Sequence, residues 1–193
     1  MIIFAGCVKL EIPVNPLLTD LPAESFGISQ PIVTQTRDDY RKTVTFKGID
    51  LVKSLSLGQY GIPNEVLTVF PRASISLENN QMLFVQLYCR YTADDWMFID
   101  YAIDINGTAI ELIAIDTNVH SGGIISEDVG LSLTREKFEQ ASEEGFNIKL
   151  YGKKGSVDFF YPPAQVRSFL DSLDRYINLK KSDPSKDVES YGY

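Results

Sequence analysis

The dipeptide Asn106-Gly107 is the feature that most constrains how this chain of 193 residues can fold. Apolar and polar residues alternate on both sides of it, over residues 99–105 and 108–115. Asn-Gly supplies the positive φ angles of a type I′ turn, so the sequence predicts a β-hairpin with a two-residue loop. This loop length sets the register, and one apolar face of the hairpin is expected to lie in the core. The pairs predicted on that face are Ile103 with Ile110, Tyr101 with Leu112, and Ile99 with Ala114.

Further strands are indicated by alternating apolar runs on either side of this hairpin. They are expected over residues 43–49, 82–91, 124–133, 146–150 and 157–161. Residues 66–77 form a weaker candidate, placed at a sheet edge because Pro71 lacks the N–H that a central strand needs. Residues 51–65 contain two glycines and a proline and are interpreted as a connection.

Two helices are predicted in the C-terminal third. Thr134 is a suitable N-cap, and Gly145 a suitable stop, for a short helix. Pro162-Pro163 opens a second helix, whose apolar residues recur at helical spacing. These residues are Val166, Phe169, Leu170, Leu173 and Ile177. We therefore expect an α+β fold, a mainly antiparallel β-sheet with one short helix and a C-terminal packing helix; the alternative is a β-sandwich-like arrangement.

Prolines set the N-terminal part of the chain apart from the rest. Residues 8–40 contain four, Pro13, Pro16, Pro22 and Pro31, which favour extended backbone and suit a spacer. This range is interpreted as a proline-spaced N-terminal arm, with an irregular arm packed on the domain as the alternative. Residues 41–179 are predicted to form the globular β-rich domain. Residues 180–193 have no apolar period and are expected to be a flexible tail.

The stretch Phe4-Ala5-Gly6-Cys7 resembles the lipobox of bacterial lipoproteins. In that family the cysteine receives a diacylglycerol, the residues before it are removed, and the lipidated N-terminus tethers the protein to a membrane. The resemblance implies that Cys7 is the lipid attachment residue and that residues 1–7 are the remnant of a signal peptide. It also implies a membrane-anchored protein of the bacterial cell envelope, facing the periplasm or the exterior. A complete signal also has a basic start and an apolar stretch of about 7–15 residues, so a start codon upstream of Met1 is expected.

Cys7 has two alternative interpretations. In the first, the match is fortuitous and residues 1–8 begin a strand that buries Cys7 as a small apolar side chain. In the second, Cys7 forms a disulfide with Cys89 in an exported protein that carries no lipid. Cys89 itself alternates with Leu83, Val85 and Leu87, so we expect it to be buried.

The formal net charge of −8 restricts the partners of this chain. It argues against nucleic acid, because the phosphate backbone rewards clusters of Lys and Arg that the sequence lacks. It also disfavours adsorption to an anionic membrane, so membrane association is expected through the lipid anchor alone. The resemblance to lipoproteins implies an envelope protein as a further candidate partner.

The sequence offers little for catalysis. His120 is the one histidine, and Ser121 follows it directly. Adjacent residues seldom place a nucleophile and its base within hydrogen-bond reach, so this segment is interpreted as a loop between strands. One His and two distant Cys do not make a zinc site, and no calcium-loop spacing is present. We therefore predict no metal and no cofactor.

The predicted hairpin places acidic and aromatic side chains outside the core. Asp100, Asp104 and Glu111 share its outer face, which would suit calcium or a glycosidase acid pair but is interpreted as a solvated acidic face. Tyr88 and Trp96 point to the second face of the sheet, where they line a groove for sugar or peptide or lie under the C-terminal helix. These five residues are the candidate binding face.

The function predicted from these observations is that of a non-enzymatic, membrane-tethered envelope lipoprotein, a binding or assembly accessory. A cytoplasmic or phage-encoded structural protein with an incidental Cys7 is the alternative. A hydrolase that depends on carboxylates comes third.

Overall fold

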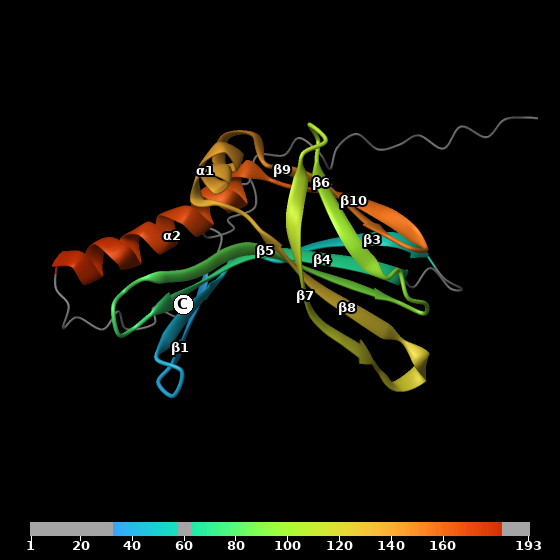
Figure 1. Cartoon of the computed structure of the whole chain (residues 1–193), viewed down its shortest axis with the longest axis horizontal. Helices are drawn as coiled ribbons and strands as arrows, with labels where there is room; N and C mark the ends of the chain where they lie inside the picture. The colour runs from blue at the N-terminus through green and yellow to red at the C-terminus, as the bar shows by residue number, and fades with distance from the viewer. Residues whose placement is uncertain (1–32, 58–62, 183–193) are drawn as a thin grey trace, which may run out of the picture. The chain divides into compact units, whose positions relative to one another are not determined.

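A computed structural model describes residues 33–57 and 63–182 (Figure 1). Its strands are β1 (Thr34–Asp38), β2 (Thr43–Lys47), β3 (Leu51–Leu57), β4 (Pro63–Ser76), β5 (Met82–Ala93), β6 (Ile99–Asp104), β7 (Ala109–Val119), β8 (Ile125–Ser132), β9 (Phe146–Gly152) and β10 (Gly155–Tyr161). Its helices are α1 (Arg135–Glu144) and α2 (Pro163–Ser182). The predicted α+β class, a mainly antiparallel sheet with a short helix and a C-terminal helix, is confirmed. Cys7 and residues 8–32 of the expected arm lie outside the described residues.

The strands form one sheet, in the order β1-β2-β4-β5-β8-β7-β6-β9-β10, with β3 beside β4. The sheet curls so strongly that two of its edge strands meet. Strand β10 contacts β3 as well as its hairpin partner β9. Lys53 Nζ donates a hydrogen bond to the Asp158 carbonyl oxygen at 2.6 Å, and Tyr161 Oη donates one to the Ile49 carbonyl oxygen at 2.8 Å. These bonds hold the curled sheet as a half-barrel.

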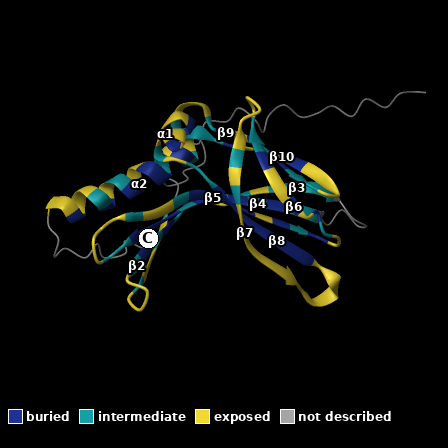
Figure 2. Cartoon of the chain, viewed as in Figure 1, coloured by how far each residue is buried: buried dark blue, intermediate teal, exposed yellow. Residues whose placement is uncertain are grey.

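Both helices pack on the inner face of this curled sheet. The Thr134 side chain accepts a hydrogen bond from the Lys137 N–H, and Gly145, with φ of 79°, ends α1 as predicted. The apolar stripe of α2 is buried, and Phe138 of α1 packs against the ring of Phe169. Figure 2 shows the buried residues along β4, β5 and β8 and on the helices. Cys89 is a free, buried thiol, as expected, and burial raises its pKa.

Strand β4 corrects the expectation of a weak edge strand broken at Pro71. It is 14 residues long and pairs with β2, β3 and β5. The missing N–H of Pro71 does no harm, because one side of β4 changes partner there: β2 ends opposite Arg72 and β3 begins opposite Val69. The Pro71 carbonyl accepts a hydrogen bond from the Gly48 N–H at 2.8 Å instead. A central strand thus contains a proline without losing a ladder bond.

The hairpin at Asn106-Gly107 forms, but the predicted register is wrong by one residue. Ala102 pairs with Ile110 and Ile103 with Ala109, so the loop holds three residues instead of two. The Asp104 carboxylate accepts hydrogen bonds from the N–H groups of Asn106 and Thr108, at 2.9 and 2.8 Å. This side-chain turn, followed by Gly107 at φ of 80°, gives the longer loop.

The shift of one residue exchanges the faces of Tyr101, Ala102 and Ile103, whereas Ile99 is buried as predicted because a bulge separates it from Tyr101. Ala102 is fully buried, whereas Tyr101, expected in the core, is 46% exposed and Ile103 is half-buried. Strands β6 and β7 also separate after two pairs, because β6 continues along β9 and β7 along β8. Ile99 therefore faces Gly152 of β9, not Ala114 as predicted.

Two segments expected to lack regular structure are strands. β3 runs within the predicted connection 51–65 and pairs with β4. β1 lies within the range 8–40 and pairs with β2, so this end of the expected arm belongs to the sheet. At the other end of the chain α2 continues to Ser182, beyond the predicted limit at residue 179.

Candidate functional site

The outer face of β4, β5, β7 and β8 carries polar and aromatic side chains, and we call it the open face. Its residues alternate with core residues of the same strands, which form one cluster with the helices. Paired residues form rows across the four strands, such as Phe70, Tyr88, Gly130 and Ile113. The neighbouring rows contain Arg72, Gln86, Ser132 and Glu111 on one side, and Thr68, Arg90, Asp128 and Asp116 on the other.

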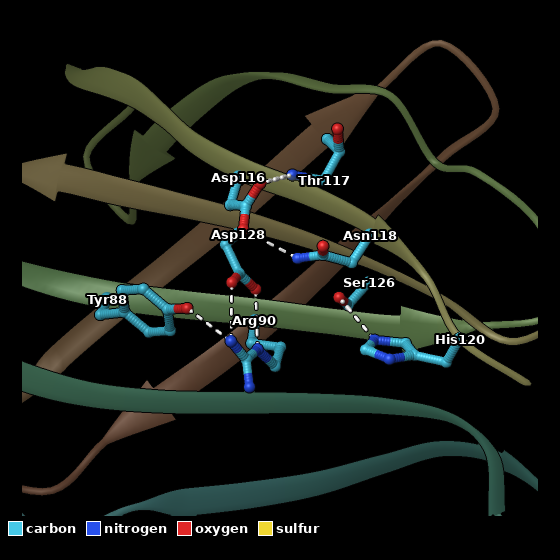
Figure 3. Close-up of polar contacts among 8 residues, drawn as sticks. All are labelled: Tyr88, Arg90, Asp116, Thr117, Asn118, His120, Ser126 and Asp128. Atoms are coloured by element: carbon cyan, nitrogen blue, oxygen red, sulfur yellow. Dashed lines mark hydrogen bonds and ion pairs between the residues drawn. The ribbon is translucent and has the colours of Figure 1, made fainter.

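An ion pair between Arg90 and Asp128 lies at the centre of this face (Figure 3). Arg90 Nε and Nη2 donate to the two oxygens of Asp128 at 2.8 and 2.7 Å, and Nη2 also donates to Tyr88 Oη at 3.0 Å. The Asp128 side chain is only 3% exposed, whereas that of Arg90 is 50% exposed. Burial acts to raise the pKa of Asp128, but hydrogen bonds from Arg90 and Tyr88, together with the charges of Arg90 and Arg72, outweigh it and hold that pKa below the ordinary value.

Aromatic rings and a second guanidinium lie beside this pair. The rings of Phe70 and Tyr88 stack with centroids 4.7 Å apart, and Arg72 Cζ lies 4.7 Å from the Tyr88 centroid and 5.5 Å from that of Phe84. The buried Gln86 amide, with its oxygen toward Arg72, accepts from Nε and Nη2 of that residue at 2.6 Å. Burial raises the pKa of Tyr88 to about 12, and the neighbouring Asp128 charge adds to the effect.

His120 contacts Ser126, not the adjacent Ser121. His120 Nε2 lies 3.0 Å from Ser126 Oγ, brought there by a tight turn in which the His120 N–H donates to the Ile124 carbonyl. Ser126 is 1% exposed, so its hydroxyl is shielded from a substrate. Among the described residues no carboxylate contacts the other ring nitrogen, so the pair lacks the third group that orients a catalytic base.

The five residues of the candidate binding face do not form one site. Tyr88 and Glu111 share the open face, in neighbouring rows. Asp104 shapes the β6–β7 turn and lies 3.8 Å from Lys137 Nζ of α1, and Asp100 is exposed on β6. Trp96 lies in the β5–β6 connection, where it lines a cleft away from α2, and α2 packs on the face opposite Tyr88. Within the described ranges no three His, Cys, Asp or Glu residues are arranged to hold a metal.

Sequence reasoning missed the role of Glu127, which organises the β5–β6 connection. Its carboxylate is buried and accepts hydrogen bonds from the N–H groups of Met97, Phe98 and Ile99, at 2.5, 3.0 and 2.9 Å. Phe98 has a positive φ of 55° and its ring is 43% exposed. The pair of adjacent acids in one strand, Glu127 and Asp128, was the available signal, because alternation sends one of them to each face.

A cleft of about 430 Å³ lies beside this connection, between β3 and the turn from β9 to β10. Trp96, Met97 and Tyr91 form part of its wall. Lys154 pairs with Asp95 at 2.7 Å and Lys53 with Asp158 at 3.1 Å, and Glu65 accepts a hydrogen bond from Tyr91 Oη at 3.3 Å. The cleft is therefore a polar opening whose charged groups already have partners within the protein.

The chain matches no family model, and no curated protein or solved structure matches it. No helix in the described part of the chain is long and apolar enough to cross a membrane.

Proposed function

We propose that this protein is a non-enzymatic envelope lipoprotein, tethered through Cys7, that binds a partner protein through the open face as a binding or assembly accessory. The observation that carries the proposal is the ion pair between Arg90 and Asp128, a buried carboxylate on a sheet face that the described helices leave uncovered. Charged groups are rarely buried outside a core without a specific role.

The side chains around this pair support binding more than catalysis. Arg and Tyr are the residue types most enriched at protein interfaces, and the ion pair and stacked rings hold them in place before a partner arrives. A catalytic carboxylate or base needs an accessible atom that exchanges a proton. Both oxygens of Asp128 are bonded to Arg90, and Ser126 is shielded.

The tether is tested by the intact mass of the protein extracted with detergent from its bacterial host. We expect a diacylglycerol on Cys7 and a chain that begins at that residue. The Cys7→Ser variant should then appear in the soluble fraction. An unmodified wild-type chain that still carries Met1 would contradict the lipoprotein proposal and favour the cytoplasmic alternative.

The binding surface is tested by photocrosslinking in cells. A photoreactive phenylalanine analogue replaces Phe84 or Ile113 on the open face, which are 39% and 45% exposed. The matched control positions, Phe160 on β10 and Leu179 on α2, are also exposed but lie elsewhere. We expect an adduct of defined mass from the open-face positions only. Adducts of the same yield from all four positions, or from none, contradict binding through this face.

A further inference from the structure

Arg72 is a cation of the open face whose charge no described carboxylate contacts. Lys47 pairs with Asp50 at 2.9 Å, and Arg90 pairs with Asp128. Arg72 instead bonds to the neutral amide of Gln86 and lies against two aromatic rings. Among the described residues Arg72 is therefore a cation without an ion-pair partner, separated by β5 and β8 from the acids Glu111 and Asp116 of β7.

The nearby acid does not complete the balance. Both oxygens of Asp128 accept hydrogen bonds from Arg90, so Asp128 acts on Arg72 only through its charge and makes no direct contact with it. Burial lowers the pKa of Arg72, while the neighbouring Tyr88 and Asp128 groups act in the opposite direction. A partly buried cation is unfavourable without a counter-charge, because desolvation weakens its interaction with water.

The geometry of the Arg72 guanidinium suits a carboxylate. Gln86 binds the edge of the guanidinium formed by Nε and Nη2. The rings of Tyr88 and Phe84 hold the plane of the guanidinium in place. Nη1 makes no hydrogen bond to the described residues, so its donors remain for a ligand. A planar guanidinium held in this way binds a carboxylate with defined direction and little loss of side-chain freedom.

We propose that Arg72 receives a carboxylate from an acidic segment of a partner protein docked on the open face. This inference rests on the proposed function and adds the chemistry of the partner. A protein segment fits better than a small anion, because the exposed apolar side chains of Phe84 and Ile113 lie on the same face. A partner that supplies both a carboxylate and apolar side chains covers the whole patch.

The first test uses a capped, fluorescent peptide that alternates glutamate and leucine. We expect the peptide to bind the protein and to shift the NMR resonance of Arg72 Nε. The affinity of the Arg72→Gln variant for the peptide should be about tenfold lower than that of the wild type. Arg167→Gln, an exposed change on α2, should have no effect. Arg72→Lys keeps the charge but loses the planar fork, so it should lose part of the affinity and supplies the comparison if Arg72→Gln does not fold.

Three results would overturn the acidic contact. They are equal binding of the peptide by Arg72→Gln, equal binding of a peptide that alternates lysine and leucine, and an equal Arg72 shift with free glutamate at the same carboxylate concentration. The last would indicate a site for a small anion.

Crosslinking separates this inference from the proposed function. Loss of the Ile113 adduct in the Arg72→Gln chain, with folding retained, supports the acidic contact, because Ile113 lies on β7 and not beside Arg72. An undiminished adduct in that variant overturns the acidic contact alone. Absence of adducts at every open-face position of the unaltered chain contradicts the proposed function itself.

Discussion

The carboxylate of Glu127 accepts a hydrogen bond from the backbone N–H of Phe98, at 3.0 Å, while Phe98 is held at a positive φ of 55°. A bulky residue rarely adopts this conformation, because its Cβ crowds the following carbonyl. The same carboxylate also binds the neighbouring N–H groups of Met97 and Ile99. Three converging donors around one anion are what make the conformation stable.

Replacing Glu127 by Gln should destabilise the fold by about 2–4 kcal/mol. The amide keeps the shape of the side chain but loses its charge and one acceptor oxygen, so buried N–H groups are left without a partner. The measurement is the free energy of unfolding in urea. Glu111→Gln, an exposed change on β7, is the control and should stay within about 0.5 kcal/mol of the wild type. Equal destabilisation by both variants would mean that the three bonds contribute nothing.

The positive φ of Phe98 predicts an unusual ranking of small residues at this position. Phe98→Gly and Phe98→Ala both remove the ring, but only glycine accepts this backbone conformation without strain. We expect the glycine variant to be more stable, by about 1 kcal/mol in urea unfolding. At Phe160, an exposed strand position without a positive φ, the order should reverse because glycine weakens a strand. An alanine variant that equals or exceeds glycine at position 98 would show that the connection relaxes freely.

The unequal exposure of Arg90 and Asp128 predicts unequal effects of removing each partner. Arg90→Gln leaves a buried carboxylate without its counter-charge and should destabilise the protein by about 3 kcal/mol. Asp128→Asn leaves an arginine that reaches water, so we expect only about 1 kcal/mol. The difference is measured by thermal or urea unfolding at neutral pH. The reverse order would indicate that Asp128 is accessible to water and that the pair is an ordinary surface contact.

Elements bounded by local chemistry could be predicted from the sequence. Thr134 and Gly145 mark α1, and Pro162-Pro163 marks the start of α2, because capping and φ restriction act within a few residues. The hairpin register failed for the opposite reason. The Asn-Gly dipeptide favoured a two-residue loop, but the Asp104 carboxylate stabilised a longer one through bonds to two further N–H groups.

The candidate site depends on pairings that no local signal specifies. Arg90 and Asp128 are 38 residues apart and meet only because β5 pairs with β8. The alternation of β5 placed Tyr88 on the face opposite Cys89, where it is 7% exposed, yet nothing in the sequence showed that α2 would pack on the Cys89 side. Trp96 was assigned to the same face because the end of β5 at Ala93 was not visible in the pattern.

The lowered pKa of Asp128 predicts a loss of stability in acid. Because its pKa is lower in the folded protein than in the unfolded chain, the ionised pair contributes fully above the unfolded value, about 3.9, and the contribution falls as pH drops through the folded value. Urea unfolding at a series of pH values should show the largest gap between wild type and Asp128→Asn above about pH 5. That gap should close in stronger acid, while Arg90 remains protonated throughout. A gap of constant size from neutral pH into acid would mean that the ionisation of Asp128 does not contribute to the fold, and that its role on the open face is that of a neutral hydrogen-bonding group.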